Sequence, residues 1–557
     1  MTPAALFDEA SARPVSRRGL LATTGLGLAG AAAQSLLGGC AVAPRTAPAS
    51  APAPASEPAT AAAGGRAGMA ALQAEPRDIA RLNRVTWGVD SAAVQAVARQ
   101  GWHGYLQAQL HPPTQGPAAT RLAADAQARV EALRALNVPM PTLVEQMEQR
   151  RRELNDIADD EAKKAAQQAY QQDLNRLARD AGAGFLFQAL YSPHQLREQL
   201  VWFWFNHFNV HQYKANLRAM VADYERVLRA HALGRFRDLL VASATHPAMI
   251  RYLDNEQNAA NRINENYARE LMELHTLGVD GGYSQKDVQE LARVLTGLGI
   301  NFSDRVPPLR PALQGQYQRI GAAAEFNPAR HDMGRKLVLG QEVGGQGWNE
   351  ILEQLVRLSR HPATARHVSR RLAMYFVADA PAPELVDRMS RAFLGSDGDI
   401  AATLQAMFDA PAFDVSLGHK FKDPVHYVVS AVRLAYDGRT IVNPAPMLGW
   451  LNRLGQGLYN RQTPDGYPLE EAAWSASGQM STRFEIARAI GSGSAGLFRS
   501  EGPAPVDTPA FPQLSNALYH ASLARTLGEP TRRALDQATS PTEWNVLLLS
   551  SPEFMYR

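Results

Sequence analysis

Residues Asp254–Gly297 read DNEQNAANRINENYARELMELHTLGVDGGYSQKDVQELARVLTG. Within 264–277, apolar side chains recur three and four positions apart, which predicts an amphipathic helix. Gly278 follows as a stop signal, because glycine readily adopts the left-handed conformation at a helix C-terminus. Ser284 and Asp287 then resemble a capping box that starts a second helix. The stretch therefore predicts a helix, a tight glycine-rich loop and another helix.

The polar side of this stretch could carry chemistry. Nine of the thirteen residues in 254–266 are carboxylates or carboxamides, which are suited to sugar hydroxyls or a hard cation. Glu270 and Glu273 are candidates for a general acid/base pair, because two nearby carboxyls can have different pKa values. In the alternative interpretation, Arg269 pairs with Glu265 and Glu273, and the amides cap turns. The candidate substrate-binding residues are Asn264, Asn266, Asp280 and Tyr283.

Histidines elsewhere suggest a divalent metal ion. His207 and His211 are four residues apart in SPHQLREQLVWFWFNHFNVH, a spacing that can place two ligands on one helix face. Asp332 follows His331 in a Gly/Pro-rich loop and could add a ligand. The glutamate of a zinc-protease motif is missing between the two histidines. The dense aromatic residues around His207 equally favour a structural role in the core.

The N-terminus predicts export. Arg17 and Arg18 lie in a twin-arginine motif before a weakly apolar run, and LGGC at 37–40 resembles a lipobox. We interpret Cys40 as the lipidated first residue of the mature chain; the alternative is ordinary cleavage without lipidation. Residues 41–75 are mostly Ala, Pro, Ser, Thr and Gly, which predicts a disordered tether. The expected order is a signal peptide (1–40), a tether (41–75) and a folded body (76–557).

The body favours helices throughout. Amphipathic segments with short loops follow one another from Asn349 to the end, and Glu145–Arg179 predicts a long exposed helix or helical hairpin. Sustained strand alternation is missing, as are a serine-hydrolase elbow, a Walker loop and a dinucleotide fingerprint. The net charge of +3 gives no reason to expect a nucleic-acid partner. We expect an all-α fold, a large multi-helix globular body.

Several segments together resemble the bacterial family DUF1800. The resemblance is carried by residues 81–88 (RLNRVTWG), 196–208 (LREQLVWFWFNHF), 264–297, 331–336 (HDMGRK), 361–372 (HPATARHVSRRL), 454–468 (LGQGLYNRQTPDGYP) and 551–557 (SPEFMYR). It implies an exported helical protein, commonly encoded beside a sulfatase-like DUF1501 protein, and it supplies no reaction. Relatives read FWHNHF where this chain has FWFNHF, so Phe205 offers no imidazole here.

Three functions are consistent with these residues. The first is a hydrolase or lyase that acts on an envelope or extracellular polysaccharide through Glu270 and Glu273. The second is a metal-dependent helical enzyme that uses His207, His211, Glu270 or Asp332. The third is a non-catalytic lipoprotein that binds a DUF1501 partner. All three expect a periplasmic protein, anchored by lipid to the outer membrane. Whether a loop at Pro464–Tyr467 lies beside the Glu270 site is open at this level.

Overall fold

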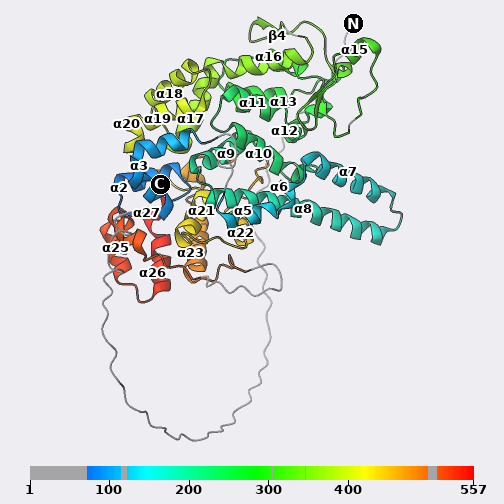
Figure 1. Cartoon of the computed structure of the whole chain (residues 1–557). Coiled ribbons are helices and arrows are strands. Elements are labelled where there is room, and N and C mark those ends of the chain that lie inside the picture. Colours follow the sequence, from blue (N-terminus) through cyan, green and yellow to red (C-terminus); the bar gives the residue numbers. More distant parts are fainter. Residues whose placement is uncertain (1–71, 114–121, 304, 345, 500–510) are drawn as a thin grey trace, which may run out of the picture. The chain divides into compact units, whose positions relative to one another are not determined.

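Helices dominate the computed structural model, which is 62% helical with only 4% strand (Figure 1). The all-α expectation is confirmed. The structure describes residues 72–113, 122–303, 305–344, 346–499 and 511–557. These belong to one compact unit, 59–557. Arg17, Arg18 and Cys40 lie outside the described residues.

The body starts slightly before the predicted end of the tether. Leu72 and Ala74 are buried, and the backbone N–H of Ala74 donates to Ser522 Oγ at 2.9 Å. The helices of this first part are α2 (Pro76–Val85), α3 (Ser91–Leu110), α5 (Ala124–Glu131), α6 (Arg134–Asn137), α7 (Met140–Asp156), α8 (Asp160–Tyr191) and α9 (Gln195–His207). Helices α7 and α8 run side by side as the predicted hairpin (Figure 1).

The next part contains the stretch quoted first. Its elements are η1 (Leu217–Ala219), α10 (Val221–His231), α11 (Phe236–Ala244), α12 (Pro247–Tyr252), η2 (Asn255–Gln257), α13 (Asn266–Glu270), η3 (Leu271–Thr276) and α14 (Gln285–Val294). The capping box at Ser284 and Asp287 is present, and Gly278 has a φ of +85°. The first predicted helix differs from expectation, because η3 is a π-helix. Its wider turn changes which side chains share a face.

Short strands interrupt the helices where the sequence predicted only loops. Strands β1 (Leu298–Ile300), β3 (Ala324–Phe326) and β2 (Gln318–Ile320) form an antiparallel sheet in that order, and β4 (Leu337–Val338) pairs with β5 (Gln341–Glu342). Two short helices lie among them, α15 (Pro311–Gln314) and η4 (Pro328–Arg330). Strands of two or three residues are too short to show an alternating pattern.

The remaining chain is helical, as predicted. Its elements are α16 (Trp348–Ser359), α17 (Pro362–Phe376), α18 (Pro383–Gly395), α19 (Ile400–Phe408), α20 (Pro411–Val415), α21 (Pro424–Ala435), α22 (Ala445–Arg453), η5 (Glu471–Ala473), α23 (Ser477–Gly491), α24 (Ala517–Ala521), η6 (Leu523–Thr526), α25 (Glu529–Asp536), α26 (Pro541–Ser550) and α27 (Pro552–Met555). Among the described residues, no helix is both long and apolar enough to span a bilayer.

Helix α9 lies in the core, and every one of its side chains is buried. Its aromatic residues pack on one another and on neighbouring helices; the rings of Phe203 and Tyr375, for example, lie 5.3 Å apart. The indole of Trp204 donates to the carbonyl of Ala232 at 2.9 Å. Buried aromatic side chains of this kind contribute large apolar areas while their polar atoms still find partners.

A buried ion-pair network joins α9 to α10. The guanidinium of Arg229 contacts Glu198 at 2.8 Å and Glu225 at 2.6 Å. Burial acts to raise the pKa of Glu198, but the charges of Arg229 and Arg197 hold it below its ordinary value. Arg229 is therefore the cation that the two carboxylates share inside the protein, and Arg197, 3.1 Å from Glu198, is a second cation for Glu198 alone.

We expect Arg229→Met to lower the free energy of unfolding by about 3–5 kcal/mol, because it leaves two buried carboxylates without their shared cation. Chemical denaturation measures this change. Arg226→Met is the matched control, because Arg226 is 67% exposed in its pair with Asp223 and should cost less than about 1 kcal/mol. Equal losses in the two variants would contradict the assignment.

Candidate functional site

Glu270 is the half-buried carboxyl at the junction between α13 and the π-helix η3. The Glu270 carboxylate makes no hydrogen bond or ion pair with another described residue. Burial, followed by the charge of Glu273, raises its pKa, and Asp465 acts in the same direction. Single π turns occur frequently at functional sites. The structure thus brings Glu270 and Glu273 close enough to interact, and adds a third carboxylate from a distant part of the chain.

That third carboxylate comes from residues 461–467, RQTPDGY, which we call the 461–467 loop. Asn206, near the end of α9, donates to the carbonyl of Tyr467 at 2.9 Å and accepts from its N–H at 2.6 Å. Asn209 donates to the carbonyls of Arg461 and Thr463 at 2.9 and 2.8 Å. The loop is therefore held by side-chain amides on its backbone and lies beside the Glu270 site.

Asp465 has the opposite electrostatic setting to Glu270. Burial acts to raise its pKa, but hydrogen bonds from Thr463 and Arg461 lower it below the ordinary value. The Arg461 guanidinium lies 3.0 Å from the carboxylate. When the environments of two interacting carboxyls shift their pKa values in opposite directions, one carboxyl is suited to act as an acid and the other as a base.

Arg371 of α17 extends this group of charges. Burial lowers its pKa, while the charges of Glu470 and Asp465 act to raise it. Its Nε atom is buried and has no hydrogen-bond partner among the described residues. The same guanidinium also depresses the pKa of His207 and His367. Arg371 thus links Asp465 to a group of buried histidines.

Three imidazoles, those of His207, His275 and His367, form this group, which we call the imidazole cluster. The ring of His207 lies 6.3 Å from that of His275 and 5.8 Å from that of His367, centroid to centroid. Burial lowers the pKa of His275 to about 3 and that of His367 to about 4, so both rings are neutral near pH 7. The cluster offers neutral imidazoles, not cations.

The imidazole cluster also completes the end of the π-helix. His207 Nε2 donates to the carbonyl of His275 at 3.1 Å, and His367 Nε2 donates to that of Leu274 at 3.0 Å. Carbonyls in the last turn of a helix have no partner within it, so these rings satisfy groups that burial would otherwise leave unpaired. Because each Nε2 carries the proton, each Nδ1 keeps its lone pair.

The four predicted substrate-binding residues do not all lie at the carboxyl pair. The amides of Asn264 and Asn266 hold turns: the Asn266 N–H donates to Asn264 Oδ1 at 3.0 Å, and Asn266 Nδ2 donates to the carbonyl of Leu253 at 3.2 Å. Asp280 is exposed on the loop after η3. The Tyr283 hydroxyl reaches Glu273 at 3.5 Å. Only Tyr283 therefore adjoins the carboxyl pair.

The predicted metal ligands are not assembled. Helix α9 ends at His207, so His211 lies beyond it and the expected pair on one helix face does not form. Asp332 instead receives hydrogen bonds from Arg293, whose Nε lies 2.8 Å from its carboxylate. Within the described ranges, no group of three His, Cys, Asp or Glu side chains is placed to hold one metal ion.

Sequence reasoning missed His367 and Arg371 as members of the site. Both lie in HPATARHVSRRL, which supported the family resemblance but looked like an ordinary amphipathic helix. Asp465 lies in the 454–468 segment, which also supported the resemblance. One signal could have found these residues: the segments that carry the family resemblance contain several polar residues, although they lie far apart in the sequence.

We expect Gly466→Ala to loosen the 461–467 loop, because an added Cβ would lie 2.1 Å from the carbonyl oxygen of Asn206. Hydrogen–deuterium exchange of the loop amides should become faster. Gly455→Ala is the control: its φ of +78° is as strained as the +75° of Gly466, but no atom lies within 4 Å of the added Cβ. It should cost about 1–2 kcal/mol without loosening the loop. Identical exchange rates of the loop amides in both variants would show that close packing against Asn206 does not hold the loop.

No curated protein and no solved structure shows significant similarity to the chain. A family model described as "Protein of unknown function (DUF1800)" matches residues 80–556, nearly the whole chain and all the elements that build the candidate site. The chain belongs to the DUF1800 family.

Proposed function

We propose that the protein is a hydrolase or lyase that acts on an envelope or extracellular polysaccharide through Glu270 and Asp465. The observation that carries this proposal is the anchoring of the 461–467 loop by Asn206 and Asn209, which places the Asp465 carboxylate where it interacts with the half-buried Glu270 carboxyl. The pKa of Glu270 is raised and that of Asp465 is lowered. Glu270 is the general acid that protonates a leaving oxygen. Asp465 is the ionised partner that accepts a proton from water or from a sugar carbon.

The surrounding groups support these roles. Burial, then the like charge of Glu273, raises the pKa of Glu270, and Tyr283 lies against Glu273. Arg371 supplies a cation that interacts with Asp465 and could also neutralise a uronate carboxylate. A lyase needs such neutralisation, because it removes the proton next to the carboxylate. Product analysis separates the two reactions, since only a lyase leaves an unsaturated, ultraviolet-absorbing sugar.

We expect Glu270→Gln to lower turnover about 10²- to 10⁴-fold on whichever polysaccharide of a broad panel the wild-type chain cleaves, because it removes the general acid. Reducing-end release and ultraviolet absorbance measure the two product types. Glu265→Gln is the matched control, since Glu265 lies in the same segment but pairs with Arg269 at 3.0 Å. Unchanged turnover in a folded Glu270→Gln variant would remove Glu270 from the mechanism.

A stability measurement checks the same variant without a substrate. A carboxyl with a raised folded-state pKa contributes stability that is present below its unfolded pKa and is lost as pH rises through the folded pKa. Relative to a side chain that does not titrate, a Glu270 carboxyl with a raised pKa therefore destabilises the fold near pH 7. Thermal unfolding should show Glu270→Gln more stable than wild type at pH 7, with the difference shrinking towards pH 4. A destabilised variant at pH 7 would mean that the carboxylate is a structural partner.

The N-terminal motifs support export and lipidation of this enzyme. Arg17 and Arg18 fit the twin-arginine route to the periplasm, and Cys40 follows a lipobox-like LGG. The residues between Cys40 and Leu72 would then connect an outer-membrane anchor to the body. We expect Cys40→Ser to abolish incorporation of labelled palmitate and to move the protein from the membrane fraction to the soluble fraction. Ser35→Ala should change neither, and palmitate labelling of Cys40→Ser would disprove lipidation at this position.

A further inference from the structure

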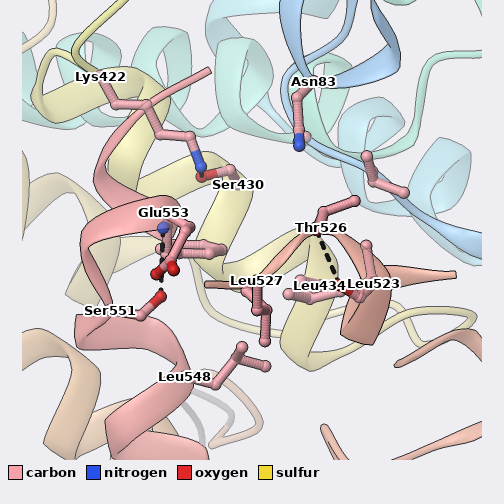
Figure 2. Close-up of a pocket in the computed structure, with 13 residues that line it drawn as sticks. Asn83, Lys422, Ser430, Leu434, Leu523, Thr526, Leu527, Leu548, Ser551 and Glu553 are labelled. Atoms are coloured by element: carbon pink, nitrogen blue, oxygen red, sulfur yellow. Dashed lines mark hydrogen bonds between the residues drawn. The ribbon is translucent and has the colours of Figure 1, made fainter. Parts of the chain in front are cut away.

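A second polar site lies in a small cavity away from Glu270 (Figure 2). The cavity has a volume of about 60 Å³ and lies between α2, α21, η6 and the chain's last helices, α26 and α27. Asn83, Thr526 and Glu553 at its edge are partly exposed to solvent, whereas Lys422 and Ser430 are each 3% exposed. The cavity therefore has an accessible side and a buried polar side.

Lys422 and Ser430 meet at the buried side. Lys422 Nζ lies 3.1 Å from Ser430 Oγ, and Figure 2 shows the amine reaching the hydroxyl at the cavity wall. The hydroxyl also donates to the carbonyl of Tyr427 at 3.1 Å. When the amine is neutral, the same hydroxyl can turn its proton towards Nζ. Gly88 leaves room for this pair, because a Cβ there would lie 2.7 Å from Ser430 Cβ.

The surroundings of Lys422 favour a neutral amine. Burial, then the charges of Arg557 and Arg483, lower its pKa to about 7. The ring of Phe554, 3.9 Å from Nζ, acts in the opposite direction by attracting the ammonium. The Glu553 carboxylate is occupied by the Gly528 N–H at 2.7 Å and by Thr531 at 2.8 Å.

The neighbouring Asp423 does not pair with Lys422 either. Its carboxylate accepts from the His426 N–H at 2.9 Å and lies 3.0 Å from His426 Nδ1. Lys422 therefore has one hydroxyl partner, and no carboxylate among the described residues forms an ion pair with it. An amine in this setting can accept a proton from the hydroxyl that it contacts.

We propose that Ser430 and Lys422 form a nucleophile and base pair that hydrolyses esters of short acyl groups, of about the size of acetate. The Ser430 oxygen attacks the carbonyl carbon while its proton passes to the Lys422 amine. The ester C–O bond breaks, and the Lys422 ammonium protonates the leaving alcohol. Water, deprotonated by Lys422, then attacks the acyl-serine, releases the carboxylic acid and restores Ser430.

The cavity defines the substrate class by its size and walls. A volume of about 60 Å³ holds only a few waters or an acetyl-sized group. Leu434, Leu523 and Leu548 also line the cavity and give it an apolar surface suited to the acyl methyl group (Figure 2). The enclosed volume therefore favours short acyl groups over longer ones. This activity is separate from the proposed polysaccharide cleavage at Glu270 and does not depend on it.

The experiment uses p-nitrophenyl acetate with the full chain. We expect a burst of p-nitrophenol, a rate that rises with pH through about 7, and an acetyl group on Ser430 detected by mass spectrometry after acid quenching. Ser430→Ala should abolish the burst, and Lys422→Met should lower the rate about 10²-fold or more. Ser492→Ala, at an exposed serine outside the cavity, should leave the rate within about twofold.

Two results would overturn the proposal. One is acetylation of surface lysines without an acetyl group on Ser430 in the wild-type chain, a result that needs no variant to fold. The other is a folded Ser430→Ala variant, verified by circular dichroism, that retains the burst. A p-nitrophenyl ester with an eight-carbon acyl chain tests the size limit, and equal turnover of both esters would place the reaction outside this cavity.

Discussion

Complete burial of α9 is the constraint on which the candidate site depends. Each polar side chain on that helix must find a partner inside the protein, since an unsatisfied buried group costs about 1–3 kcal/mol. Asn206 meets this requirement by clamping Tyr467, and His207 by donating to the π-helix. The hydrogen bonds that hold the 461–467 loop and the end of η3 therefore follow from burying the polar side chains of α9 in the core. A substitution that changes how α9 packs in the core will therefore also change the geometry of the candidate site.

The same constraint explains the electrostatics. The imidazole cluster is buried and neutral, so it adds no positive charge where α9 meets η3. Thr463 and the Arg461 guanidinium, 3.0 Å away, favour the ionised form of Asp465, whereas the charge of Arg269 does not offset burial and Glu273 at Glu270. A lower dielectric constant than that of water amplifies this asymmetry, because charge interactions are stronger at a given distance. One carboxyl thus stays protonated more readily than its neighbour.

Local signals in the sequence predicted the helices well, because periodicity, capping and glycine stops act over a few residues. The Ser284 capping box and the Gly278 stop are both present. The π-helix was missed, since its extra residue per turn depends on partners such as His367 from α17. The short strands near β3 were missed because their pairing is tertiary. Glu270 and Glu273 were recognisable as a pair, but the loop that brings Asp465 to them is 195 residues from Glu270, and no local pattern encodes that approach.

Helix α21 connects the two proposed sites. His426, near its start, lies 3.2 Å from Gln199 of α9, whereas Ser430, one turn later, faces the cavity of Figure 2. Gln199 Oε1 also accepts from Arg557 at 3.0 Å, and Arg557 is one of the charges that depress the pKa of Lys422. A substitution at Gln199 would thus act on both the core helix that holds the 461–467 loop and the charge balance beside Ser430. Residues that share partners in this way give non-additive effects, so their contributions are separable only by double-mutant cycles.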